Sequence, residues 1–222
     1  MLQKIRTGIV KFPEIKVKPG ELHKARGYFS NRYERYDLLH NHDRDTGKHL
    51  YRYPAVQFKI NRFFSIFGYK QEGIEILKDI FLTSENLVIE GKIIEIYGKE
   101  IEVKEAVFGE EGQFYVYEFL TPWIALNQAN YKEYMRIDDD TQKNRMLNSI
   151  LVNNIISFCK FAGYTIKSRL EVKSKFLEVQ ANLKGKTHNA FKGEFMVNFL
   201  LPDFLGLGKS SSRGYGNILI KL

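Results

Sequence analysis

Cysteine is nearly absent from this chain of 222 residues, in which Cys159 is the single one. One thiol cannot form a disulfide within the chain, so a disulfide-stabilised scaffold is excluded and we expect a reducing compartment, the cytoplasm. Long apolar runs are missing too, because no stretch approaches the roughly 18 to 20 residues of a membrane-spanning helix. Residues 1–12 lack the apolar core of a signal peptide. We therefore expect no membrane partner.

Acidic residues are the minority among the charges. The 26 Asp and Glu residues stand against 34 Lys and Arg residues, which leaves a net charge of +8. A surface of that sign attracts polyanions, namely nucleic acid, an anionic membrane or an acidic protein, and charge alone does not choose among them. The chain is 44% hydrophobic, which is enough for one large core or two small ones.

The first half of the chain predicts strands and helices in the order β-α-β-β-α-β. Alternation of apolar and polar residues indicates strands, and apolar residues spaced by three and four indicate helices. The expected elements are a strand at 3–17, a helix at 21–39, strands at 51–61 and 63–69, a helix at 73–82 and a strand or hairpin at 87–98. This order is the ferredoxin-like arrangement.

The second half has one main helix, at 141–161, and we interpret it as a degenerate copy of the first half. A hairpin is expected at 99–120, turning at Gly109 to Gly112, and Pro122 with Trp123 marks a hinge. Further strands are expected at 165–183 and 191–201. The predicted fold class is α+β, with tandem ferredoxin-like (RRM-like) βαββαβ domains at 1–120 and 121–222, the second degenerate.

Three consecutive aspartates, Asp138, Asp139 and Asp140, precede the main helix of the second half. Negative charge is favoured at a helix N-terminus, and Asp140 is the expected cap. A metal-binding triplet is the alternative, but adjacent residues rarely converge on one ion. We therefore expect no metal and no cofactor.

Four glycines fall within the eleven residues GLGKSSSRGYG at 206–216. Glycine loses the most backbone entropy on folding, so the cluster is costly unless its conformations are needed. A nucleotide-binding loop does not fit, because no glycine stands at the required place before Lys209 and too little chain follows. A simple turn needs fewer glycines. We expect the backbone of this loop, with Lys209 and Arg213, to approach a polyanion or to lie against the main helix.

The spacing of these glycines resembles the signature loop of the CRISPR-associated endoribonucleases that cut repeat RNA into guide RNAs, the sixth Cas family. The glycine-hydrophobic-glycine triplets at 206–208 and 214–216, with the five residues KSSSR between them, match every position of that loop. The resemblance implies RNA contacts from the loop residues Gly206, Gly208, Lys209, Arg213, Gly214 and Gly216.

Three of the five histidines gather in one polar stretch, as His40, His42 and His49. A single histidine on a polar loop is usually exposed and has no specific function. A pair at i and i+2 ahead of the aromatic YRYP favours a functional role. A metal site would lack a nearby cysteine or a clear carboxylate ligand. The stretch resembles a branch of the same family in which a histidine pair precedes such a strand. This implies catalytic roles for His40, His42 and Tyr51.

Two further groups of basic residues are candidates for phosphate contact. Cations interleave with tyrosines on the predicted first helix, where an RNA-binding face and a merely solvated face are equally supported. Along 165–183, four cations at alternate positions are expected on one face of a strand or hairpin: Lys167, Arg169, Lys173 and Lys175.

The resemblance implies a metal-independent endoribonuclease that cuts CRISPR repeat RNA by attack of the 2′-hydroxyl, leaving a 2′,3′-cyclic phosphate. Histidine suits this chemistry because it titrates near neutral pH and can act as base or acid. The alternative is a non-catalytic RNA-binding subunit of a CRISPR ribonucleoprotein complex, since related proteins share the fold and loop without cutting. An unrelated basic protein is a third, weaker interpretation. The expected partners are repeat RNA, other Cas proteins and a second copy of the chain.

Overall fold

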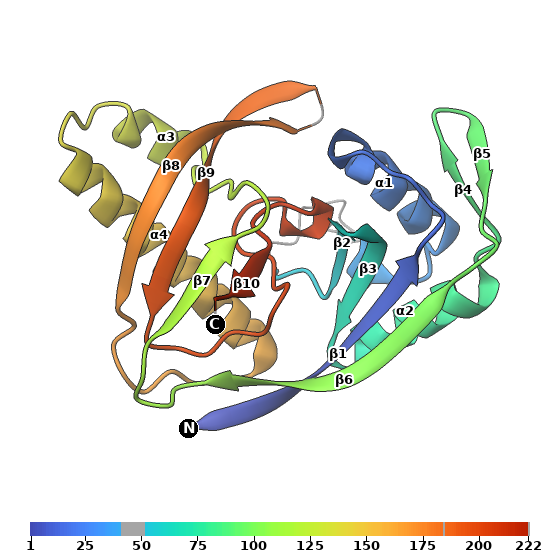
Figure 1. Cartoon of the computed structure of the whole chain (residues 1–222), viewed down its shortest axis with the longest axis horizontal. Helices are drawn as coiled ribbons and strands as arrows, with labels where there is room; N and C mark the ends of the chain where they lie inside the picture. The colour runs from blue at the N-terminus through green and yellow to red at the C-terminus, as the bar shows by residue number, and fades with distance from the viewer. Residues whose placement is uncertain (41–51, 184, 222) are drawn as a thin grey trace. The chain divides into compact units, whose positions relative to one another are not determined.

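The computed structural model describes residues 1–40, 52–183 and 185–221, and the chain divides into two compact units (Figure 1). The N-terminal unit comprises Ile5–Ala106 together with Ser212–Gly214. The C-terminal unit comprises Met1–Lys4, Val107–Ser211 and Tyr215–Leu222. The main crossing from one unit to the other thus falls between Ala106 and Val107, upstream of the division that we expected at residue 120.

The N-terminal unit is built on a four-stranded sheet with the strand order β2-β3-β1-β6. Strands β2 and β1 both pair antiparallel with β3. Two helices fill the connections, so the order along the chain is βαββαβ and the fold is ferredoxin-like, as predicted. The elements are β1 (Leu2–Phe12), α1 (Leu22–Arg32), β2 (Val56–Asn61), β3 (Phe63–Tyr69), α2 (Lys70–Thr83) and β6 (Glu100–Gly109).

The strand that completes this sheet is not the expected one. Strands β4 (Asn86–Ile89) and β5 (Lys92–Glu95) form a separate two-stranded hairpin, and β6 takes the place beside β1. The expected hairpin at 99–120 is also wrong, because β6 and β7 (Tyr115–Phe119) belong to different sheets. An alternating pattern identifies a strand, but the partner of that strand is set by packing far away in the sequence.

Aromatic rings form the centre of the N-terminal core. Phe29 of α1 lies on the sheet, with its ring centroid 5.9 Å from that of Phe12, 5.8 Å from Phe58 and 6.2 Å from Phe64. All four side chains are buried. Burial of one such side chain stabilises the fold by about 1.5 to 3 kcal/mol. This cluster holds α1, and with it the turn that follows α1, firmly on the sheet.

The C-terminal unit repeats the arrangement with one helix missing. Its sheet has the order β10-β7-β9-β8, and α4 crosses one face of it (Figure 1). Residues 198–217 stand where a second helix would be, and they contain only the short helical turn η3 (Ser211–Arg213). The degenerate second copy is therefore confirmed. The elements are α3 (Gln128–Tyr134), α4 (Asp140–Ala162), β8 (Val172–Leu183), β9 (Lys186–Val197) and β10 (Ile218–Ile220).

The N-cap of helix α4 lies one residue earlier than expected. Asp139, and not Asp140, is the N-cap, because its carboxylate accepts hydrogen bonds from the backbone N–H of Thr141 at 2.6 Å and of Gln142 at 3.2 Å. These bonds, that from Thr141 first, lower the pKa of Asp139. The helix ends at Ala162 and is capped by Gly163, whose φ of 76° is left-handed.

The C-terminal core centres on Trp123. Its ring stacks on that of Phe119, with 5.2 Å between the ring centroids, and its centroid lies 5.3 Å from that of Phe176. Its Nε1 donates a hydrogen bond to Asn154 Oδ1 of α4 at 3.0 Å. Cys159 is buried in α4, as expected. Among the helices of the described residues, none is long and apolar enough to cross a membrane.

Candidate functional site

The first glycine triplet of the loop packs on the core of the C-terminal unit. Gly208 has a φ of 81°, and a Cβ there would lie 2.5 Å from Nε1 of Trp123 and 3.1 Å from Oδ1 of Asn154. Leu207 between the glycines is fully buried. Gly208 is therefore required by close approach to Trp123 and α4, which is one of the two roles expected for the loop.

The two triplets also hydrogen-bond to each other. The N–H of Leu207 donates to the carbonyl of Gly216 at 2.8 Å, and the N–H of Gly216 donates to Pro122 at 2.9 Å. A Cβ on Gly216, whose φ is 64°, would overlap the Leu207 carbonyl oxygen. Gly206 forms a bridge with Asn217. The glycines fold the loop back on itself, so they shape the backbone that presents Lys209.

The middle of the loop, Ser212–Gly214, belongs to the N-terminal unit. Gly214 has a φ of 84°, and a Cβ there would lie 2.6 Å from Leu22 Cδ1 and 3.1 Å from the Phe58 carbonyl oxygen. Burial, followed by the nearby charge of Arg213, lowers the pKa of Arg26 in α1 to about 10. Arg26 therefore stays charged at neutral pH, beside a second guanidinium.

Arg26 also fixes the turn that carries His40. Its guanidinium donates to the Leu39 carbonyl at 2.8 Å, and the Ser30 hydroxyl donates to the same oxygen at 3.0 Å. Arg52 donates to the carbonyls of Asp37 at 2.5 Å and His40 at 3.3 Å. His40 ends the helical turn η2 (Asp37–Leu39). The backbone at His40 is thus held by three side chains from outside the turn.

One side-chain nitrogen of His40 has no hydrogen-bond partner in the part of the chain that the structure describes. This atom, Nε2, is buried. Burying a polar atom without a partner costs about 1 to 3 kcal/mol, so such an atom calls for an explanation. Arg26, which donates to the carbonyl of the preceding residue Leu39, brings positive charge to this turn. The other two residues expected to be catalytic, His42 and Tyr51, lie outside the described residues, as does His49.

Ser30 and Arg52 were not singled out as site residues from the sequence, and Arg26 was considered only as one of the cations of the first predicted helix. Arg26 and Ser30 are spaced i, i+4 on α1, so they share a face of the helix. Both donate a hydrogen bond to the Leu39 carbonyl, which is a backbone group present in every residue and therefore cannot be recognised from the sequence. Only the spacing on α1 could have pointed to the pair.

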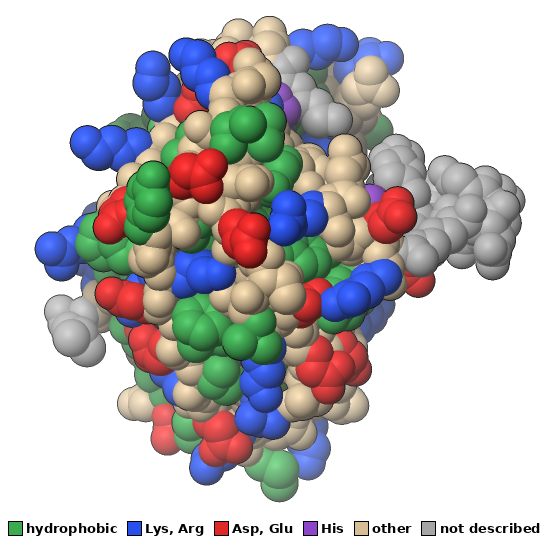
Figure 2. All heavy atoms as spheres, turned by 90° about the vertical axis from the view of Figure 1, so that its right-hand side faces the viewer, with side chains coloured by type: hydrophobic (Ala, Val, Ile, Leu, Met, Phe, Trp, Pro, Cys, Tyr) green, Lys and Arg blue, Asp and Glu red, His purple; other side chains and the backbone are tan. Residues whose placement is uncertain are grey.

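The other cations of α1 and of the turn after it are engaged within the N-terminal unit. Lys24 pairs with Glu90, and Arg35 pairs with Asp79. Arg32 donates to the Thr83 carbonyl at 3.1 Å. Figure 2 shows basic and acidic side chains mixed over the face that is turned to the viewer. These contacts favour a structural role for the three cations.

The four cations expected on one strand face are divided by the structure. Lys173 and Lys175 lie on β8, are exposed and point to the sheet face opposite α4. Lys167 and Arg169 precede β8, in the exposed loop between α4 and the sheet. The expectation of a single strand face is therefore wrong for these two, because the strand begins only at Val172.

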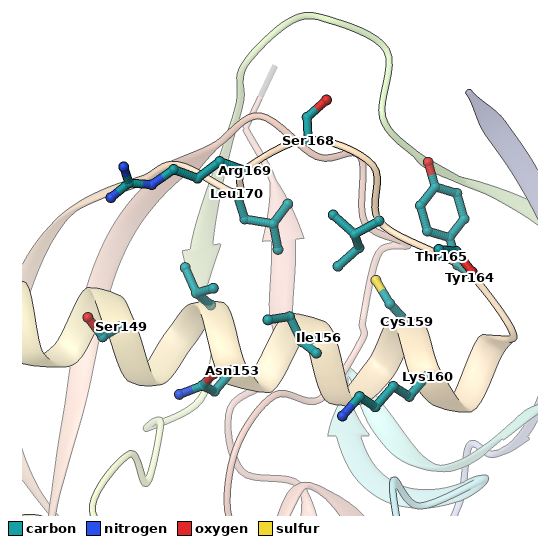
Figure 3. Close-up of a pocket in the computed structure, with 12 residues that line it drawn as sticks. Ser149, Asn153, Ile156, Cys159, Lys160, Tyr164, Thr165, Ser168, Arg169 and Leu170 are labelled. Atoms are coloured by element: carbon teal, nitrogen blue, oxygen red, sulfur yellow. The ribbon is translucent and has the colours of Figure 1, made fainter.

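Arg169 lies at the rim of a groove between α4 and the loop that follows it (Figure 3). The groove has a volume of about 700 Å³, and Cys159 and Leu170 point into it. Burial, followed by the charge of Glu110, raises the pKa of the Cys159 thiol to about 12. A thiol with that pKa is not a nucleophile at neutral pH. Across the described ranges, no group of three His, Cys, Asp or Glu side chains could hold a metal ion.

Comparison with known proteins agrees with this architecture. The profile of the Cas6b N-terminal domain matches residues 3–107, and that of the Cas6b C-terminal domain matches residues 109–220. The chain is similar to a protein of Methanocaldococcus jannaschii described as uncharacterised, at 37% identity over 144 residues, which are 64% of this chain and 96% of that protein.

Two solved structures are similar over the whole length. A crystal structure of Cas6b has a TM-score of 0.91 at 32% identity, covering 99% of this chain and 100% of that one. A CRISPR RNA processing endoribonuclease Cas6b has a TM-score of 0.77 at 30% identity, with the same coverage of 99% and 100%. The chain belongs to the Cas6b family of CRISPR RNA-processing endoribonucleases.

Proposed function

We propose that this protein cuts CRISPR repeat RNA without a metal ion, by attack of a 2′-hydroxyl on the adjacent phosphorus. The 2′-hydroxyl gives its proton to a base, a bond forms from O2′ to phosphorus, and the bond from phosphorus to O5′ breaks. An acid then protonates the departing O5′. The products are a 2′,3′-cyclic phosphate and a 5′-hydroxyl.

The observation that carries this proposal is the arrangement around His40. His40 stands on a turn held by Arg26, and the charge of Arg213 acts on Arg26. Histidine is the residue type most often used for proton transfer near neutral pH. Guanidinium groups stabilise the negative charge that grows on phosphate oxygens in the transition state. In the proposal, His40 and His42 act as base and acid, and Tyr51 orients the phosphate.

The proposal is tested by incubating the protein with a radiolabelled repeat RNA in excess EDTA and analysing the ends of the products. We expect cleavage, with a 3′ end that resists phosphatase until acid opens the cyclic phosphate, and a 5′ end that polynucleotide kinase labels directly. Strict dependence on added divalent metal, or a 3′-hydroxyl with a 5′-phosphate, would contradict the mechanism. Binding without any cleavage would favour the non-catalytic subunit.

The proposal also covers the cellular location and the binding partners of the protein. A single buried thiol suits a reducing compartment, so we propose a cytoplasmic location. The proposed partners are the repeat RNA, other Cas proteins of an effector complex and a second copy of the chain. Sedimentation of the protein with and without repeat RNA measures the last of these directly.

A further inference from the structure

The tip of the β8–β9 hairpin brings a histidine and a lysine to one face of the C-terminal sheet. In the register of the hairpin, Ala181 pairs with His188 and Leu183 pairs with Lys186. Cross-strand partners share a face, and so do alternate residues of one strand. Lys186, His188 and Ala190 therefore point to the same side as Ala181 and Leu183.

The glycine loop covers part of this same face. Ala181, Leu183 and Ala190 pack in one buried cluster with Ile124 and with Tyr215 of the loop. The hydroxyl of Tyr215 donates to the carbonyl of Asn182 in β8. The end of the glycine loop is thus fixed on the hairpin.

Lys209 reaches this face through Ile124. The two residues form an antiparallel bridge, in which the N–H of Lys209 donates to the carbonyl of Ile124 at 3.1 Å. Since bridged residues share a face, the Lys209 side chain projects on the side of Ile124 and Ala190, away from α4. Gly208, the residue before it, faces Trp123 and α4 instead.

The charges around His188 are positive. Its pKa is lowered, first by burial and then by the charges of Lys209 and Lys186. Tyr215 is the titratable side chain that the loop places on the same cluster, and its hydroxyl is engaged by Asn182. Glu178 of β8 points to the opposite face, where its carboxylate accepts from Asn189 at 2.7 Å and from Tyr134 at 3.4 Å.

We propose that Lys186, His188 and Lys209 form a phosphate-binding site for the RNA backbone, in which His188 takes up a proton as the RNA binds. Lys186 and Lys209 are exposed and His188 is half-buried, so all three can meet an anion at the surface. The inference rests on the proposed function, because it names a contact for the same RNA. It adds His188, which lies far along the chain from the histidine pair.

Because protonation of His188 and binding of RNA are linked, the direction in which RNA affinity changes with pH can be derived. In the free protein His188 is largely neutral at pH 7, because its pKa lies below the usual 6.5. A bound phosphate favours the charged form and raises that pKa. Affinity then rises as the pH falls through the pKa of the complex, and it levels off below the pKa of the free protein. Each unit of difference between the two pKa values corresponds to about tenfold in affinity.

The test measures binding of a repeat-sequence RNA with 2′-O-methyl groups, which keeps the phosphates and removes the nucleophile. Affinities are compared between pH 8 and pH 5.5 for the wild type, His188→Gln and Lys186→Ala. We expect the wild type to bind the RNA more tightly at pH 5.5 than at pH 8. The His188→Gln variant should lose the part of this increase in affinity that comes from protonation of His188. Lys186→Ala should lower the salt slope by about one. Lys104→Ala is the matched control, because that exposed lysine of β6 lies 3.6 Å from Glu102 in an ion pair.

A direct measurement does not depend on how the variants fold. The His188 imidazole signals of the wild-type protein are titrated by NMR with and without the methylated RNA. A rise in the pKa of His188 on binding supports the proposal, and an unchanged pKa overturns it, as does a His188→Gln variant with the wild-type pH dependence. Cleavage of unmodified RNA is assayed in parallel, so failure to cut refutes the proposed function and leaves the pH-linked binding to be judged on its own result.

Discussion

At the scale of single residues, the glycines of the loop are explained by what surrounds them. Gly208 meets Trp123, and Gly216 meets the Leu207 carbonyl, each with a positive φ. The sequence predicted that unusual backbone conformations were needed. It could not show whether RNA or protein lies against these glycines, because a glycine pattern indicates only that a side chain would not fit.

Gly208→Ala should destabilise the protein more than Gly112→Ala. Both glycines have a positive φ, 81° and 79°, so each substitution costs about 1 to 2 kcal/mol for the left-handed backbone. A Cβ at Gly112 meets nothing within 4 Å, whereas one at Gly208 lies 2.5 Å from Trp123 Nε1. Overpacking adds about 1 to 3 kcal/mol at Gly208.

The measurement is the Tm of each variant, where 1 kcal/mol corresponds to about 2 to 4 °C for a chain of this size. Gly112→Ala isolates the backbone cost, and the extra loss at Gly208 reports the contact with Trp123. Equal losses in Tm would mean that the loop does not pack on Trp123 as described.

At the scale of elements, pairing was harder to predict than the existence of strands. The segment 87–98 has the alternation of a strand pair, and it forms β4 and β5, yet it stands apart from the central sheet. Strand β6 fills the edge instead. Alternation of apolar and polar residues indicates that the two sides of a segment face different environments, but it does not identify the strand that pairs with the segment.

The cap of α4 gives a pH-dependent prediction. Since the folded-state pKa of Asp139 is lowered, its contribution to stability is present above the ordinary pKa of 3.8 and is lost as the pH falls through the folded value. Asp139→Asn keeps a side-chain oxygen acceptor without a titrating charge.

We expect Asp139→Ala to lower Tm at pH 7 and Asp139→Asn to lower it less. The gap in Tm between the wild type and Asp139→Asn should shrink as the pH falls below 3.8. Asp140→Ala is the control, because the two capping hydrogen bonds go to Asp139. A larger loss from Asp140→Ala than from Asp139→Ala would contradict the assigned cap.

Strand β8 and the loop before it should differ in RNA binding. Lys173 and Lys175 share one face of a strand, so a double alanine variant removes two cations held at a fixed spacing. Because each phosphate contact contributes about 0.7 to 0.9 to the salt slope, we expect the slope to fall by about one to two. The Lys167→Ala/Arg169→Ala variant should reduce it less. The reverse ranking would place the RNA along the groove side of the unit.

At the scale of the whole molecule, the two-unit plan followed from the order of elements, and the position of the site did not. The glycine loop and the histidine stretch are more than 150 residues apart in the sequence. The charge of Arg213 acts on Arg26, and Arg26 donates to the turn before His40, and both interactions appear only in the folded chain. The family resemblance named His40 without the residues that hold it.

If His40 takes part in proton transfer, as proposed, its removal must slow the chemical step of cleavage. The measurement is single-turnover cleavage of repeat RNA at saturating protein, where defects in binding no longer affect the rate. His40→Ala is compared with the wild type and with His23→Ala, a histidine of α1 without an assigned role, and RNA affinity is measured for each. We expect the rate to fall by a factor of about 10² to 10⁴ for His40→Ala alone, with RNA affinity little changed. A near-normal rate for His40→Ala, or a similar loss for His23→Ala, would contradict it.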